Sequence, residues 1–191
     1  MEYILIIISA VLVNNIVLNQ FLGICPFLGV STKVSTALGM GAAVLFVMTV
    51  STAVTHLAYS VLLVPFGLEY MRTVTYILII AALVQMVEII LKKVSPALYQ
   101  ALGVFLPLIT TNCAILGVAI MVVQKDFSLM KSIVFAGANS AGFAFALIIF
   151  AGIRERLDLM DTPKAMKGAP LALITAGLLA LAFMGFSGMI K

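Results

Sequence analysis

Long apolar runs, separated by short stretches that hold most of the charged residues, constrain this chain more than any other feature of its sequence. Of its 191 residues, 64% are apolar and only 9% are charged, unlike an ordinary soluble domain. A helix needs about 20 largely apolar residues to cross the roughly 30 Å hydrocarbon core of a bilayer. The sequence therefore predicts an all-α membrane protein with six transmembrane helices, near residues 3–24, 36–64, 74–91, 98–123, 130–151 and 170–190.

The links between these runs are too short to fold on their own, which predicts a single integral membrane domain over residues 1–191. The first run opens with Glu2 and has no basic segment before it, so we do not expect a cleavable signal peptide. No phosphate-binding loop, zinc-ligand spacing or pair of nucleophile and base is apparent. The chain alone is therefore not expected to be an enzyme.

The net charge of +4 does not indicate nucleic-acid binding, because the basic residues are scattered and no aromatic residues alternate with them. It indicates orientation instead, since cytoplasmic loops of membrane proteins carry an excess of Lys and Arg. An external N-terminus places most of the basic residues inside, so both termini are expected to be external. The cytoplasmic residues would be Lys33, Lys92, Lys93, Arg154, Arg156, Lys164 and Lys167, and the external ones Arg72, Lys125, Lys131 and Lys191.

The motif C-x-x-L-G-V occurs twice and contains the only two cysteines of the chain, Cys25 and Cys113. Division after Lys93 gives residues 1–93 and 94–191, with three predicted spans and one motif in each part. Because three is an odd number, the second part enters the membrane from the opposite side, which predicts an inverted-topology repeat. Equivalent positions of such a repeat meet near the membrane midplane, so the two cysteines are expected to face each other there.

Helix-breaking and polar residues surround both cysteines and predict that the first and fourth helices are broken. They are Gly23, Pro26 and Gly29 around Cys25, and Pro107, Thr110, Thr111, Asn112 and Gly117 around Cys113. Unpaired backbone groups in lipid cost several kcal/mol each, so broken helices persist only where protein or a ligand satisfies them. Discontinuous spans of this kind are typical of a binding site.

Three interpretations of the cysteines remain open at this point. Each could be a small apolar filler, the two could form a disulfide, or both could be thiolate ligands of a metal or cluster. An iron-sulfur cluster of the common type takes four cysteines, whereas this chain has two. A second protein would then have to supply the others.

Other polar residues in the spans indicate packing more than chemistry. Asn14, Asn15 and Asn19 are expected on about one face of the first helix, where they would bond to other helices or line an ion path. His56, late in the second span, is expected to be a hydrogen-bonded histidine near the membrane surface rather than a proton relay.

A different class of function also fits the predicted architecture, because many stand-alone secondary transporters are inverted repeats with broken helices. In a transporter the cysteines would only pack, and polar side chains would bind the solute. The candidate solute ligands are Asn14, Asn19, Thr111 and Asn112. A membrane anchor for other proteins is a third class, in which the cysteines would be dispensable.

Four segments closely resemble one membrane-protein family, and the resemblance covers nearly all 191 residues. They are LVNNIVLNQFLGICPFLGVS, LGVFLPLITTNCAILGVA, GANSAGFAFALIIFAGIRERL and KAMKGAPLALITAGLLALAFMGF. They resemble the A subunit of the Rnf complex, an ion-translocating ferredoxin:NAD oxidoreductase, and are similar to the E subunit of the sodium-pumping NADH:quinone oxidoreductase. The resemblance implies that Cys25 and Cys113 are half of the ligand set of one 2Fe-2S cluster, shared with a related six-span partner, the E subunit of the Rnf complex.

The resemblance also implies a role in electron transfer within the bacterial cytoplasmic membrane. Electrons from ferredoxin would pass through the B subunit, the shared cluster, and the G, D and C subunits to NAD. These other subunits would carry FMN, riboflavin and further iron-sulfur clusters. Export of Na⁺ or H⁺ would be coupled to this transfer.

Overall fold

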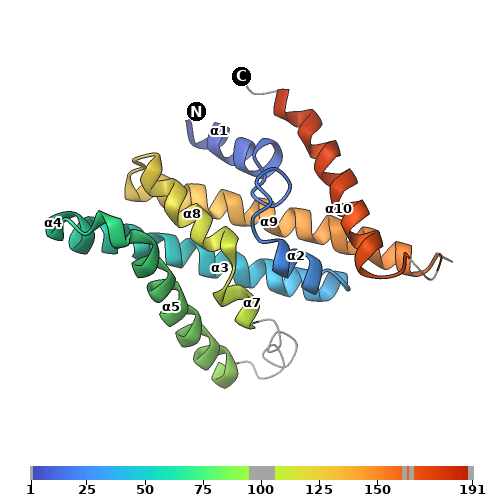
Figure 1. Cartoon of the computed structure of the whole chain (residues 1–191), viewed down its shortest axis with the longest axis horizontal. Coiled ribbons are helices and arrows are strands. Elements are labelled where there is room, and N and C mark those ends of the chain that lie inside the picture. Colours follow the sequence, from blue (N-terminus) through green and yellow to red (C-terminus); the bar gives the residue numbers. More distant parts are fainter. Residues whose placement is uncertain (1, 95–105, 161–162, 164–165, 189–191) are drawn as a thin grey trace.

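The computed structural model describes residues 2–94, 106–160, 163 and 166–188, and every regular element in these residues is helical. Figure 1 shows the arrangement of the longer helices. The α-helices are α1 (Glu2–Ile8), α2 (Ile24–Val30), α3 (Val34–Ala58), α4 (Val64–Phe66), α5 (Arg72–Val94), α7 (Leu106–Thr110), α8 (Cys113–Gln124), α9 (Leu129–Asp158) and α10 (Ala169–Met184). Short π-helices, η1 (Ser9–Val13) and η2 (Tyr59–Leu63), and 3₁₀ turns, η3 (Glu69–Met71) and η4 (Gly185–Gly188), extend them.

Four helical stretches in the described part of the chain are long and apolar enough to cross a membrane. They are Val34–Phe66, Glu69–Ile90, Pro107–Gln124 and Leu129–Asp158. The first and last apolar helices, Tyr3–Val13 and Ala169–Met184, are shorter. The prediction of an all-α protein is confirmed for the described residues, which contain four candidate spans. Six transmembrane helices remain a prediction.

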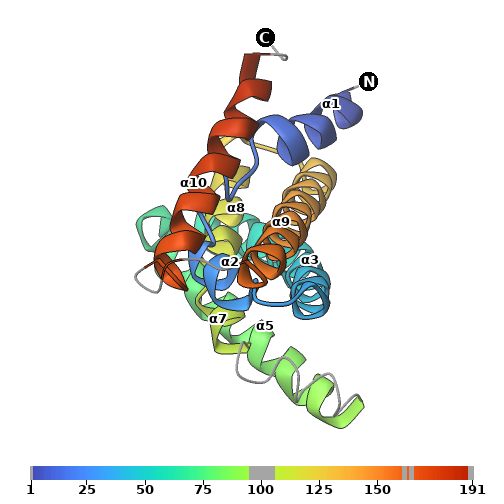
Figure 2. The same ribbon diagram turned by 90° about the vertical axis from the view of Figure 1, so that its right-hand side faces the viewer.

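Helices α3 and α9 run antiparallel and form the centre of the molecule (Figure 1). They approach closely because small residues face each other across the contact. A Cβ atom added at Gly41 of α3 would lie 2.8 Å from the Cβ atom of Ala144, and one added at Gly137 of α9 would lie 3.7 Å from Cγ2 of Thr49. In lipid, such small residues allow the van der Waals packing that holds helices together. In Figure 2, α3 and α10 lie on either side of α9.

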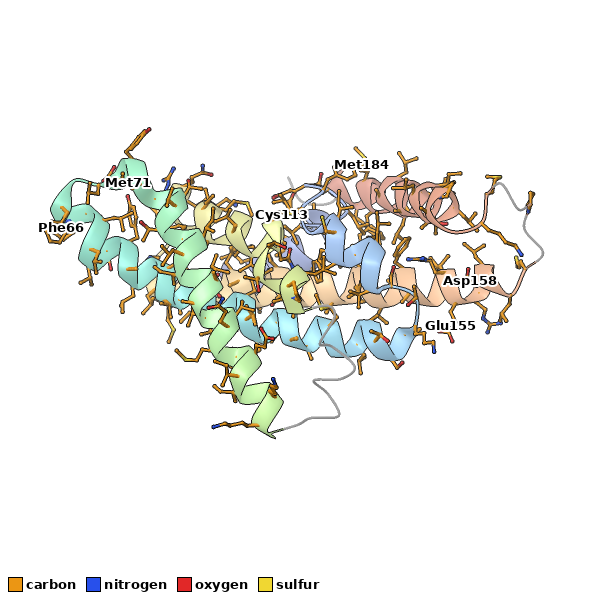
Figure 3. The ribbon with its side chains drawn as sticks, turned by 60° about the horizontal axis from the view of Figure 1, so that its bottom comes forward. Phe66, Met71, Cys113, Glu155, Asp158 and Met184 are labelled. Carbon is orange, nitrogen blue, oxygen red and sulfur yellow. The ribbon has the colours of Figure 1, made fainter. Side chains whose placement is uncertain are left out.

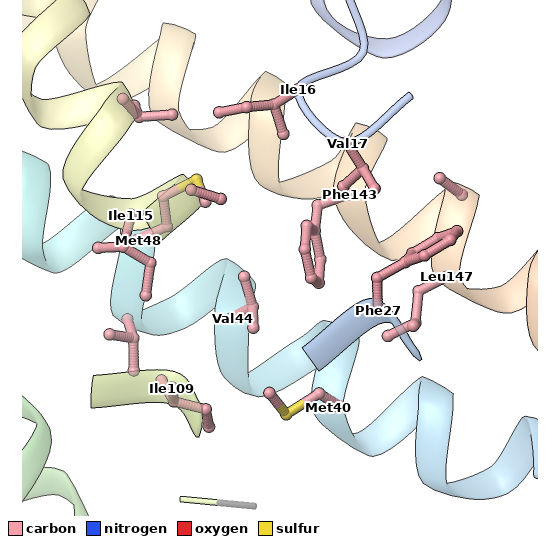
Figure 4. Packing of buried hydrophobic residues seen from close by; sticks show 14 of the residues in the cluster. Ile16, Val17, Phe27, Met40, Val44, Met48, Ile109, Ile115, Phe143 and Leu147 are labelled. Carbon is pink, nitrogen blue, oxygen red and sulfur yellow. The ribbon is translucent and has the colours of Figure 1, made fainter. Parts of the chain in front are cut away.

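Side chains from α2, α3, α8 and α9 form one hydrophobic core (Figure 4). The rings of Phe27 on α2 and Phe150 on α9 are stacked with their centroids 4.4 Å apart. Phe143 of α9 is completely buried, as is Met40 of α3. The short helix α2 is therefore packed against the two central helices rather than lying free in the lipid.

Helix α9 continues to Asp158, seven residues past the end of the predicted span at residue 151. The cationic side chain of Arg154 favours this extension, because Nη1 donates hydrogen bonds to the carbonyl oxygen of Leu28 and to Oγ of Ser31, both at 2.8 Å. These acceptors lie at the C-terminal end of α2, where carbonyl groups lack helical partners and a positive charge is favourable.

Candidate functional site

The first apolar segment is interrupted before Cys25 rather than after it. Residues 14–23 form turns between η1 and α2, and Gly23 precedes α2 with a φ of 79°. The expectation that Pro26 and Gly29 interrupt the helix is wrong, because both lie within α2. Pro26 is the third residue of α2, in the first turn, where its missing N–H leaves no helical hydrogen bond unmade.

The fourth apolar segment is interrupted at Thr111 and Asn112, between α7 and α8. Asn112 ends the interruption by capping α8, since its Oδ1 accepts a hydrogen bond of 3.0 Å from the backbone N–H of Ala114. Cys113 is the first residue of α8. Gly117 lies inside α8 and does not break it; a Cβ atom there would be 2.7 Å from Cδ1 of Leu22.

The two cysteine motifs meet where α2 and α8 begin. The backbone N–H of Gly23 donates a hydrogen bond to Sγ of Cys113, with 2.9 Å between nitrogen and sulfur. Cys25 is two residues further along the chain, in the first turn of α2. Figure 3 shows Cys113 beside the segment that contains α2. The structure thus brings together two motifs that are 88 positions apart in the sequence, and the contact comes from tertiary packing.

Both thiols are free and exposed on the surface of the chain. Neither is a buried filler, and the structure does not join them in a disulfide. An exposed thiol is available to a second protein or to a ligand. Both cysteines therefore lie outside the buried core of this chain.

The residues at this place fit half of an iron-sulfur ligand set. Two thiols are available as soft ligands for iron, and the Gly23 N–H already donates to one of them. Cys113 is the first residue of α8, where the backbone N–H groups at the start of the helix carry partial positive charge. Asn112 Nδ2 is a buried donor with no hydrogen-bond partner among the residues that the structure describes. No group of three or more His, Cys, Asp or Glu gathers anywhere in the described residues, so the remaining ligands would come from outside this chain.

The asparagines of the first segment do not share one helical face, because the chain leaves its helical path after Val13. Asn15 is buried and donates a hydrogen bond of 2.8 Å from Nδ2 to the carbonyl oxygen of Gly142 on α9. Its Oδ1 accepts from the N–H of Val17 at 3.1 Å and so stabilises the turn. The expected hydrogen bonding between segments is confirmed for Asn15.

The single histidine is hydrogen-bonded as the sequence predicts. Nε2 of His56 lies 2.9 Å from the carbonyl oxygen of Phe127, in the turn between α8 and α9. This bond links the end of α3 to that turn. His56 therefore has a structural partner, the backbone of the turn between α8 and α9.

The fold and this site together define a helical membrane protein that presents two free thiols where its two broken segments meet. A family model described as "Rnf-Nqr subunit, membrane protein" matches residues 3–190. The chain belongs to this family of membrane subunits, and the resemblance inferred from the four sequence segments is confirmed.

Relatives over the full chain carry consistent names. The A subunit of the ion-translocating oxidoreductase complex of Syntrophotalea carbinolica is 59% identical over 97% of this chain and 96% of the relative. The A subunit of the Na⁺-translocating ferredoxin:NAD⁺ oxidoreductase complex of Acetobacterium woodii is 58% identical over 99% and 98%. The A subunit of the ion-translocating complex of Vibrio cholerae is 51% identical over 100% and 98%. These relatives are subunits of an oxidoreductase.

Proposed function

We propose that this chain is the A subunit of an ion-translocating ferredoxin:NAD oxidoreductase complex and that it holds half of a 2Fe-2S cluster within the bilayer. One observation carries the proposal: the hydrogen bond from Gly23 N–H to Cys113 Sγ joins the two cysteine motifs and leaves both thiols exposed. Cys25 and Cys113 would be the iron ligands of this chain. Two further cysteines would come from a related protein, the E subunit of the Rnf complex, in contact with the exposed thiols.

The bound 2Fe-2S cluster would supply one-electron redox chemistry inside a membrane in which no side chain can carry an electron. The residues of this chain hold two thiolates in place and shield them from one side. Asn112 caps the helix on which Cys113 lies, and Phe143 fills the space behind Gly23. Both side chains are buried, so the ligands stand on a rigid support.

The names of the relatives support a place in a larger electron path. The Acetobacterium protein is named for Na⁺ translocation and for ferredoxin and NAD. In the proposed complex, electrons from ferredoxin would reach NAD by way of the cluster and the B, C, D and G subunits, which would carry FMN, riboflavin and further iron-sulfur clusters. Electron transfer is coupled to export of Na⁺ or H⁺ across the bacterial cytoplasmic membrane.

Within the chain, we propose two inverted repeats, residues 1–93 and 94–191, with three spans each. The antiparallel packing of α3 on α9 supports this arrangement, because these helices are the second spans of the two parts. The position of a cysteine motif at the first interrupted segment of each part supports it as well. The short helices α1 and α10 would complete the six spans of one membrane domain.

The proposed orientation places both termini outside the cytoplasm. After Lys93 and at Lys167, we expect a cytoplasmic reporter to be active and an external reporter to be inactive. After Lys191 we expect the reverse, because cytoplasmic links hold most basic residues. Paired fusions of alkaline phosphatase and a fluorescent protein measure this. A fusion after Lys125, between α8 and α9, is the external control. The reverse pattern would overturn the orientation.

Spectroscopy of the purified complex tests the proposed function against a stand-alone transporter. We expect visible absorption that bleaches on reduction by ferredoxin and a paramagnetic signal of one reduced 2Fe-2S cluster beyond those of the other subunits. The matched sample is the complex in which both cysteines of this chain are replaced, as C25S/C113S, and it should lack only that signal. Identical spectra and iron contents in the two samples would contradict the proposal and favour the transporter.

A further inference from the structure

The hydrogen bond on Cys113 distinguishes the two thiols of this chain. Cys113 Sγ accepts from the backbone N–H of Gly23 at 2.9 Å. In the described part of the chain, no hydrogen bond reaches the sulfur of Cys25. The donor belongs to the first cysteine motif and the acceptor to the second, so the bond crosses between the two motifs. A main-chain donor depends on the backbone geometry of Gly23 and not on a flexible side chain.

The surroundings of Gly23 hold this N–H in place. Its φ of 79° is a conformation that glycine adopts without strain and that other L-residues rarely adopt. An added Cβ atom would lie 2.8 Å from Cε2 of Phe143, 3.1 Å from Cβ of Ala114 and 3.2 Å from Oδ1 of Asn112. All three of these neighbours are buried. A side chain at position 23 would therefore meet both an unfavourable φ and three close neighbours, and a backbone shift that accommodates it would alter the N–H bond to sulfur.

We propose that Gly23 is a positioning residue that sets the reduction potential of the cluster through its N–H bond to Cys113, an inference that rests on the proposed function. A hydrogen-bond donor stabilises negative charge on a thiolate sulfur, and the stabilisation grows when an electron adds to the iron it binds. The bond therefore raises the potential relative to a cluster without it. It also fixes the ligand geometry across both motifs.

The direct test is pulsed electron paramagnetic resonance on the reduced complex, grown with ¹⁵N-labelled glycine. An amide that donates to a cluster ligand shares electron spin with the cluster, so we expect a coupled glycine ¹⁵N in the wild-type complex. In Gly23→Ala the label at position 23 is absent and that coupling should disappear. In the control Gly29→Ala it should remain, because Gly29 lies in the neighbouring helix α2 and an added Cβ there makes only an ordinary contact of 3.7 Å with Leu108.

The potential is the second readout, measured by redox titration of the same signal. In Gly23→Ala the added Cβ atom is strained by the positive φ and crowded by its neighbours. If the backbone shifts to relieve this, the N–H bond to sulfur weakens, and we expect the ratio of reduced to oxidised cluster at fixed potential to fall about tenfold, equivalent to about 59 mV for one electron. Gly67→Ala is the control for backbone strain, since its φ is also positive, at 64°, and nothing lies within 4 Å of the added Cβ. It should leave the potential unchanged.

The outcomes separate this inference from the proposed function. A wild-type complex without the cluster signal would overturn the function itself. A cluster with no coupled glycine ¹⁵N, or with a coupling and potential unchanged in Gly23→Ala, would overturn only the role of Gly23. If Gly23→Ala does not assemble, the double variant Gly23→Ala/Phe143→Leu removes the closest contact, and the same two readouts decide.

Discussion

Either serine substitution, Cys25→Ser or Cys113→Ser, is expected to remove the cluster signal and to lower electron transfer from ferredoxin to NAD by at least about 100-fold. Loss of an outer-shell partner alone costs about 10–100-fold in metal affinity or activity, and these substitutions remove a ligand. Serine keeps the size of the side chain but presents a hard oxygen where iron binds a soft thiolate. Iron content, the paramagnetic signal and the rate of NAD reduction of the purified complex are the measurements.

The control for these variants is Thr111→Val. Thr111 lies two residues before Cys113 and is exposed, and its side chain makes a local hydrogen bond from Oγ1 to the carbonyl oxygen of Pro107. It should keep the cluster and most of the activity. Full iron content in both cysteine variants would show that Cys25 and Cys113 are not ligands. Loss of assembly together with the signal in Thr111→Val would show that the segment is sensitive for structural reasons.

Gly41→Leu is expected to prevent assembly of the protein into its complex, because it enlarges the tightest point of the α3–α9 contact. Even a Cβ atom at Gly41 would lie 2.8 Å from Cβ and 3.3 Å from Cα of Ala144, so the helices would have to separate. Overpacking of a core costs about 1–3 kcal/mol, and a loss of about 1–2 kcal/mol already changes cellular abundance several-fold. The amount of the protein in membranes and the thermal unfolding of the complex measure the effect.

Gly152→Leu is the matched control, since Gly152 lies in α9 with nothing within 4 Å of an added Cβ atom. It should assemble normally. Gly41→Ala should fall between the two, because one methyl group needs a smaller displacement of the backbone. Equal amounts of Gly41→Leu and Gly152→Leu in the membrane would contradict the close α3–α9 packing.

The sequence predicts the long helices well because their limits depend on charge and hydropathy. The starts of α3, α5 and α9, which lie at or shortly after Lys33, Arg72 and Lys125, are within two residues of the predicted starts. It does not predict where the first segment leaves its helical path. Oδ1 of Asn15 accepts a hydrogen bond from the N–H of Val17, which competes with helical hydrogen bonding. Proline predicts a break at position 26, yet Pro26 lies within α2.

The meeting of the two cysteine motifs was predictable from the repeated sequence, but the hydrogen bond that joins them was not. That bond requires a positive φ at Gly23 and a buried ring at Phe143 behind it. Neither property can be recognised in a glycine-rich apolar sequence, because several other glycines here lie in ordinary helix. Gly29 and Gly117 flank the same cysteines and have no such role.

Helix α2 is anchored at both ends, by Gly23 to Cys113 at its start and by Arg154 to Leu28 and Ser31 at its finish. Its middle is held by the stacked rings of Phe27 and Phe150. A seven-residue helix held in this way connects its two ends mechanically. A displacement of Cys113 therefore either moves α2, and with it the guanidinium of Arg154 at the far end, or breaks one of the three contacts.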